Sequence, residues 1–276
     1  MDDANETNWE TLWTILVHAY SRKKLSLPGD KLVALSGVAR HMMSRIKDIY
    51  VAGMWRRSLE VMLMWKVSGI GPRPPHYRAP SWSWASTNGL IWFNPGIERQ
   101  SLIYVEDVVL DHATDDSTGA VTGGWLDLRG CLKPMRLRST KNVRDKDPWP
   151  ADWYMIVDSS TMSEHHANTT HEELITCLLD TIHSGESAFD DDNMEERLFF
   201  MPGLIQGKPD ESPTLWCLLF RLTKSKNKNK TFERIGVGGG GAEHKKKLLL
   251  AELDEDTKAR LPCLRYENGL HTIRII

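Results

Sequence analysis

A run of prolines between residues 72 and 80 constrains the fold of this chain more than any other feature. Proline has no backbone N–H and a fixed φ, so this stretch suits neither a helix interior nor a central strand. Before it, apolar residues recur with a helical period, and after it they alternate with polar residues over short runs. We therefore expect a helical segment over residues 1–70, a connector over 71–80 and a β-rich domain over 81–276.

The N-terminal segment carries three helical patterns. The first helix is indicated by a stripe of side chains on one face, namely Trp9, Leu12, Trp13, Leu16 and Tyr20. A second helix is expected from about Asp30, as N-cap, to about Asp48. A third helical face, after an interruption at Gly53, is expected to run from Trp55 to Trp65.

The β-rich domain is expected to contain several short strands and one helix. The helix is predicted near residues 170–184, where an acidic first turn is followed by an apolar stripe that ends at Gly185. The expected fold class is α+β, with the helical segment packed on a mainly antiparallel, sandwich-like or barrel-like domain. The alternating runs that predict its strands are 102–110, 126–132, 153–157, 198–205, 214–222, 232–235 and 272–276.

The stretch RAPSWSWAS, residues 78–86, alternates two tryptophans with serines. In an extended chain Trp82 and Trp84 would share one face, and we expect them to pack against the aromatic face of the helices. Together with Trp13, Trp55 and Trp65 they are predicted to be structural residues. The alternative is that these rings line an aromatic pocket between helices and sheet and stack on a ring-shaped ligand.

Charge and composition exclude several classes of protein. The net charge of -2 gives no overall attraction to nucleic acid or to acidic lipid. No run approaches 18 apolar residues, and the acidic, polar start does not resemble a secretory signal, so we expect a cytoplasmic protein with no membrane association. Four dispersed cysteines form no C-x-x-C pair and are expected to be small buried hydrophobic residues.

Two segments have the residue types of nucleotide or phosphate sites. Gly236–Gly241 matches G-x-G-x-x-G after a candidate strand, but that strand is charged and few residues follow it, so we interpret the run as a flexible loop. Lys224–Lys230 could contact phosphates and is better interpreted as a hairpin loop.

Two further segments have the residue types of metal sites. Glu164–His166 with His171–Glu173 lacks zinc-site spacing, and the acidic run 190–196 lacks the glycine and spacing of a calcium loop. We interpret both as solvated loops. The sequence selects no catalytic residue, and we expect no bound cofactor or metal.

Trp13 is followed by six segments whose residues and order resemble those of a known family. That family is the fungal heterokaryon-incompatibility (HET) proteins, in the region that follows their HET domain. The segments are HAYSRKKLSLPGDKLVALSGVAR at 18–40, YVAGMW at 50–55, MLMW at 62–65, YRAPSWSWAS at 77–86, GAVTGGWLDLRGCL at 119–132 and TFERIGV at 231–237. The glycine run after Ile235 is less typical of the family, and the sequence has no stretch like R-G-W-T-x-Q-E of the HET domain itself.

The resemblance implies a non-enzymatic accessory or sensing region that works with protein partners in fungal non-self recognition and programmed cell death. Effector chemistry of the HET domain is not carried over, because its motif residues are not present in this sequence. The alternative is a small-molecule-binding protein or enzyme, which fold resemblance alone does not exclude.

Overall fold

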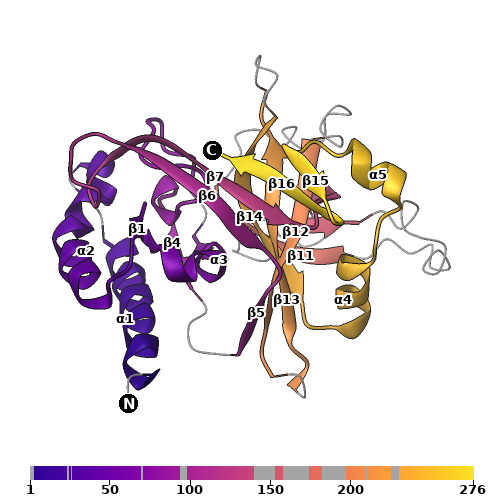
Figure 1. Ribbon diagram of the computed structural model, residues 1–276, viewed down its shortest axis with the longest axis horizontal. Helices are drawn as coiled ribbons and strands as arrows, with labels where there is room; N and C mark the ends of the chain where they lie inside the picture. Colours follow the sequence, from indigo (N-terminus) through magenta and orange to yellow (C-terminus); the bar gives the residue numbers. More distant parts are fainter. Residues whose placement is uncertain are drawn as a thin grey trace, which may run out of the picture.

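The computed structural model describes residues 3–23, 25, 27–69, 71–93, 98–139, 153–157, 174–181, 197–208, 211–224 and 230–276. It shows an α+β fold with a helical N-terminal lobe beside a large, mostly antiparallel sheet, which confirms the expected fold class (Figure 1). Within these residues no helix combines the length and the apolar character needed to cross a membrane.

The N-terminal lobe is built on two helices that lie side by side, α1 (Asp3–Ser21) and α2 (Val33–Ile46) (Figure 1). The 3₁₀ turn η1 (Pro28–Lys31) leads into α2, whose N-cap is Leu32 rather than the expected Asp30. The third helix that we expected over 55–65 is wrong for most of its length. The chain instead forms a small hairpin, a single helical turn and a strand: β1 (Tyr50–Val51), β2 (Met54–Trp55), η2 (Arg56–Ser58), α3 (Leu59–Met62) and β3 (Lys66–Ser68).

The proline run does not separate two independent units. Strand β3 pairs with β4 (Leu90–Trp92) from beyond the run, and β4 also contacts α1. Residues Arg78 to Ala85 are buried. The chain therefore returns to the N-terminal lobe after the prolines before it enters the large sheet.

The large sheet joins strands from distant parts of the sequence. Its main path runs β5 (Arg99–Ser101), β12 (Leu198–Gln206), β13 (Thr214–Leu222), β14 (Thr231–Gly240), β11 (Leu174–Leu179), β10 (Trp153–Ile156) and β9 (Arg136–Ser139). Strand β16 (Leu270–Ile275) runs parallel to β14 and antiparallel to β7 (Val121–Gly130). The two remaining short strands are β8 (Lys133–Pro134), beside β12, and β15 (Arg265–Glu267), beside β16.

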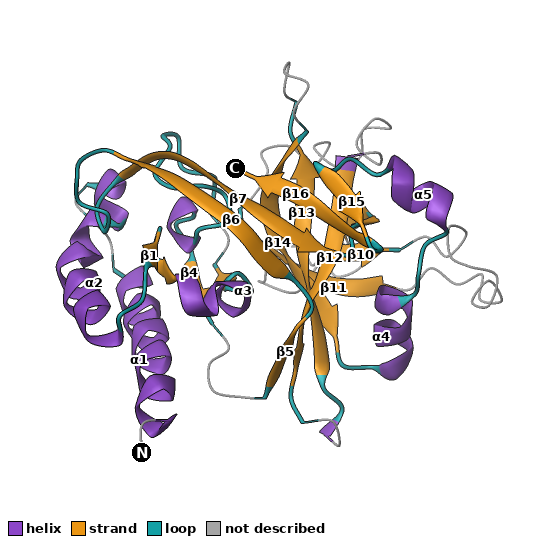
Figure 2. Cartoon of the chain, in the orientation of Figure 1, coloured by secondary structure: helices purple, strands orange, loops and turns teal. Residues whose placement is uncertain are grey.

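A long hairpin connects the two parts of the molecule. Strands β6 (Tyr104–His112) and β7 extend from the large sheet across the N-terminal lobe (Figure 1). At its far end, Thr118 donates a hydrogen bond to the carbonyl of Ser36 in α2, at 3.3 Å. Helices α4 (Glu243–Leu250) and α5 (Glu255–Arg260) lie on the side of the sheet away from α1 and α2 (Figure 2).

The helix expected near 170–184 is wrong, because residues 174–179 form strand β11. The side chains of Ile175, Cys177 and Leu179 are buried while Thr176 and Leu178 face outward, which is the period of a strand. The apolar residues of this short segment fit the period of a helix as well as that of a strand. Because the segment pairs with β10 and β14, it forms a strand.

The glycine run is also not a loop, because β14 continues through Gly240. A Cβ on Gly236 would lie 2.4 Å from the carbonyl oxygen of Leu178, and one on Gly239 would lie 2.2 Å from that of Leu215. The glycines therefore let neighbouring strands approach closely on both sides. The other segments considered as sites, 164–166, 171–173, 190–196 and 225–229, lie outside the described residues.

Two hydrophobic cores follow from this arrangement. One lies between the N-terminal lobe and the sheet and contains the aromatic side chains of α1, β2 and residues 82–84. The other lies under α4 and consists mostly of aliphatic and sulfur-containing side chains such as Met155, Ile175 and Leu249.

Candidate functional site

Five tryptophans that the sequence singled out lie in the core between the lobe and the sheet. We call Trp13, Trp55, Trp65, Trp82 and Trp84 the tryptophan cluster; each exposes at most 2% of its surface. The rings of Trp13 and Trp55 meet edge to face with centroids 5.3 Å apart, and Tyr50 packs against both. Such aromatic pairs add to the free energy of burial.

The backbone at Gly53 organises the cluster. Its carbonyl accepts hydrogen bonds from the indole N–H of Trp13 at 2.9 Å and of Trp84 at 2.7 Å. Gly53 has φ +96°, and a Cβ there would lie 2.5 Å from Trp84 Nε1, so only glycine fits. The indole of Trp65 donates to the carbonyl of Trp82 at 2.9 Å.

Two indole N–H groups of the cluster are buried without a hydrogen-bond partner. They belong to Trp55 and Trp82. The rings are held there by packing alone, and each unpaired N–H reduces the stability that the packing provides.

The serines between the tryptophans connect the cluster to both parts of the molecule. Residues 81–86 form a turn and the 3₁₀ helix η3 (Trp84–Ser86) rather than the extended strand that we expected, and Ser81 and Ser83 are buried as well. Ser83 Oγ donates to the carbonyl of Ala52 at 2.6 Å, and Ser81 Oγ donates to that of Ile276 and accepts from the N–H of Arg234 at 3.0 Å. The alternation therefore serves hydrogen bonding as much as packing.

A buried ion pair borders the cluster on the sheet side. The guanidinium of Arg234, in β14, stacks on the Trp65 ring at 3.4 Å and donates to the Trp65 carbonyl at 2.6 Å. Its Nη2 lies 3.3 Å from Oδ1 of Asp180. Burial raises the pKa of Asp180 to about 7, and the charge of Arg234 opposes that rise. Burial also lowers the pKa of Arg234 to about 10.

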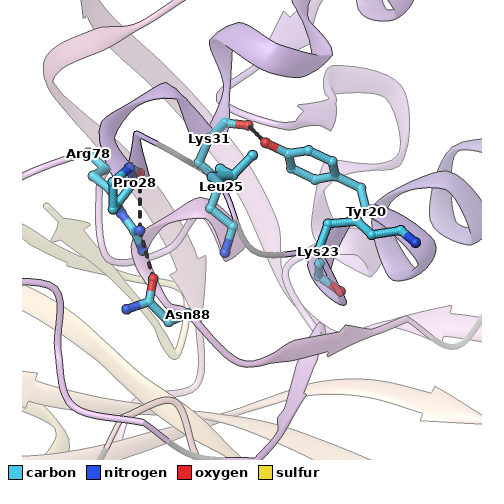
Figure 3. Close-up of a pocket in the computed structure, with 8 residues that line it drawn as sticks. Tyr20, Lys23, Leu25, Pro28, Lys31, Arg78 and Asn88 are labelled. Carbon is cyan, nitrogen blue, oxygen red and sulfur yellow. Dashed lines mark hydrogen bonds between the residues drawn. The ribbon is translucent and has the colours of Figure 1, made fainter.

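A pocket of about 310 Å³ lies near Trp84, because Tyr20 and Lys31 of its lining both contact the Trp84 ring. Figure 3 shows the residues that line it. Lys31 is 5% exposed; its ammonium donates to the carbonyl of Thr87 and sits 5.3 Å from the centre of the Trp84 ring. The pocket is lined by Tyr20, Ser21, Lys23, Leu25, Pro28, Lys31, Arg78 and Asn88.

Polar contacts hold two walls of the pocket in place (Figure 3). The hydroxyl of Tyr20 donates to the carbonyl of Lys31 at 3.0 Å. On the other wall, Arg78 Nη1 donates to Oδ1 of Asn88 at 2.7 Å and to the carbonyl of Pro28 at 3.2 Å. Desolvation and the nearby charge of Arg78 lower the pKa of Lys31 to about 7.

Sequence reasoning placed the tryptophans in the core and missed the ionisable residues next to them. Arg78 and Arg234 stand in segments that we singled out, but nothing in a sequence shows that a charged side chain is buried. Asp180 fell in the segment mistaken for a helix. Among the described residues, no three His, Cys, Asp or Glu side chains gather as a metal site would require.

The serine hydroxyls at the cluster donate to backbone carbonyls, and Ser86 donates to the carbonyl of Ser83 at 2.7 Å. Their arrangement is therefore one of structural support. No protein-family model, no curated protein and no solved structure matches this chain.

Proposed function

We propose that this chain is a non-enzymatic accessory or sensing region of a fungal heterokaryon-incompatibility protein. In this proposal it acts in the cytoplasm through protein partners, in non-self recognition that leads to programmed cell death, and these 276 residues contain no stretch like the HET motif R-G-W-T-x-Q-E. The proposal rests on the resemblance of six sequence segments to that family, which implies the function.

The observation that supports it best is where those segments meet. YVAGMW supplies Gly53, whose carbonyl holds the indoles of Trp13 and Trp84. MLMW supplies Trp65, which bonds to the backbone of Trp82 in the SWSW stretch. TFERIGV supplies Arg234, which stacks on Trp65. Segments that are far apart in the sequence thus specify one connected structural unit, and a shared unit of this kind is what common ancestry would preserve.

The aromatic-pocket alternative finds less support. The five rings expose at most 2% of their surfaces. None of them is among the residues that line the pocket beside Trp84.

The test is to determine the full-length transcript that encodes this chain. We expect an in-frame sequence upstream of Met1 that encodes a HET-type domain or its remnant. A transcript that starts directly before Met1, together with turnover of a metabolite by the purified chain, would contradict the proposal and favour an enzyme. The chain expressed without the upstream region should not arrest growth of a fungal host, and growth arrest by this chain alone would also count against the proposal.

A further inference from the structure

The pocket beside Trp84 has an unusual charge balance. Three of its lining residues are cationic, Lys23, Lys31 and Arg78, and none of the eight is acidic. The exposed Asp30 raises the pKa of Tyr20 but is not part of the lining. A concave site with low-dielectric walls and one sign of charge concentrates anions.

Arg78 supplies the strongest geometric evidence. The residue is 8% exposed, and its Nη1 is occupied by Asn88 and Pro28. Its Nε and Nη2 atoms are buried without a hydrogen-bond partner. These two nitrogens form one edge of the guanidinium, with parallel N–H groups at the spacing of two oxygens of a phosphate or carboxylate.

Lys31 adds a second buried basic side chain, and the described lining of the pocket offers it no carboxylate. Its ammonium contacts a neutral carbonyl and an aromatic ring, and it repels Arg78. Two buried cations in a pocket lined without an acid destabilise the fold unless an anion compensates them. The exposed Lys23 provides the first charge that an entering anion would meet.

We propose that this pocket binds the phosphate group of a small phosphorylated molecule, with the Nε and Nη2 edge of Arg78 and the ammonium groups of Lys31 and Lys23 as donors. The volume of about 310 Å³ is at the lower end for ligand sites, which suits a small molecule rather than a dinucleotide. Both free nitrogens of Arg78 are buried. Anion binding therefore requires the Arg78 side chain or the adjoining wall to shift. The site does not depend on the proposed family.

The experiment is thermal unfolding of the purified chain in increasing inorganic phosphate, with sodium chloride at matched ionic strength. A ligand that binds only the folded state raises the apparent Tm in a saturable manner. We expect phosphate and glucose 6-phosphate to raise the Tm above the chloride series, and glucose and citrate to have no such effect.

Three variants assign the effect to the pocket. Arg78→Met should raise the phosphate concentration needed for half of the shift at least tenfold, and Lys23→Met should raise it a few fold. The control Arg45→Met removes an exposed arginine of α2 outside the pocket and should leave the shift unchanged. Nonspecific stabilisation by phosphate salts would appear equally in all variants.

The proposal is overturned if phosphate gives no shift beyond chloride, or if Arg78→Met and Lys23→Met respond like the unmodified chain. A shift with citrate and none with phosphate overturns the phosphate assignment. If Arg78→Met does not fold, Lys23→Met decides the question, because its side chain is exposed and its removal does not disturb the core.

Discussion

The two regions beside Trp84 differ in how buried positive charge is balanced. In the tryptophan cluster, the buried Arg234 lies 3.3 Å from Asp180, although Trp55, Trp82 and this ion pair all keep polar atoms without a hydrogen-bond partner. In the pocket, Lys31 is buried, one edge of Arg78 has no partner, and none of the lining residues is acidic. A buried cation beside an opposite charge fits a structural role, whereas buried cations in a pocket lined without an acid need another explanation. The comparison therefore favours stability for the cluster and ligand binding for the pocket.

The largest expected effect tests the structural side. Trp84→Ala removes a fully buried ring and should lower the free energy of unfolding by about 3 to 5 kcal/mol. Denaturant unfolding measures this loss. As a control, Trp92→Ala should cost less, because 48% of Trp92 is already in water. A Trp84→Ala protein as stable as the unmodified chain would remove the cluster from its structural role.

The next effect tests the backbone that supports the cluster. Gly53→Ala forces a side chain onto φ +96° and places its Cβ 2.5 Å from Trp84 Nε1. The backbone conformation alone should cost about 1 to 3 kcal/mol. Gly37→Ala is the matched control: in α2, with nothing within 4 Å of the added Cβ, it should stabilise by about 0.5 to 1 kcal/mol. Equal effects at both glycines would contradict this account.

The third prediction concerns how the free energy of unfolding depends on pH, which reports on Lys31 in the pocket. The pKa of Lys31 is lowered to about 7 in the folded chain, against 10.5 when it is exposed. Below pH 7 the lysine is charged in both states and its burial cost is complete. As pH rises from 7 toward 10.5, only the unfolded chain keeps the proton, so the stability increases by at most about 1.4 kcal/mol per pH unit.

Lys31→Met should remove that increase. Lys66, whose pKa burial lowers to about 8, contributes in the same pH range, so the quantity to compare is the slope of the unmodified chain minus that of the variant. Asp180 titrates at lower pH, between its exposed value and about 7, and does not interfere. Parallel slopes in the two proteins would contradict the lowered pKa of Lys31 in the folded chain.

The smallest effect separates paired from unpaired indoles inside the cluster. Trp65→Phe leaves the carbonyl of Trp82 without its donor, whereas Trp82→Phe removes an N–H that has no partner. Both lose similar volume, so Trp65→Phe should be the more destabilising by about 1 kcal/mol. The difference in denaturation midpoints at equal m-values measures it, and the reverse order would mean that the two indoles exchange roles in solution.

Elements with one unambiguous period were predicted better. The alternation of Leu126 and Leu128 in β7 corresponds to a buried face. The stripe of α1 is right for Trp13 and, in part, for Trp9, Leu16 and Tyr20, but Leu12 is 46% exposed and Val17 is buried in its place. Elements whose residues fit two periods were not. Segment 174–179 became a strand because β10 and β14 pair with it, and the glycine run became a strand because only glycine lets β11 and β13 approach so closely.

For the candidate site, the sequence identified residues but not their environment. The five tryptophans were expected inside, since large apolar rings are buried wherever a core can hold them. Lys31, Arg78, Asp180 and Arg234 carry charges, and charged residues are mostly exposed, so the sequence offered no reason to bury them.

By itself, the sequence determined the α+β class, the helical start and the burial of the five tryptophans, because periodicity and side-chain size are properties of short segments. Only the tertiary structure decided that residues 50–55, 82–87 and 234 converge and that Lys31 and Arg78 share a pocket whose lining has no acid. The reason is physical: the cost of burying a charge depends on every group that the folded chain brings around it, and those groups come from distant parts of the sequence.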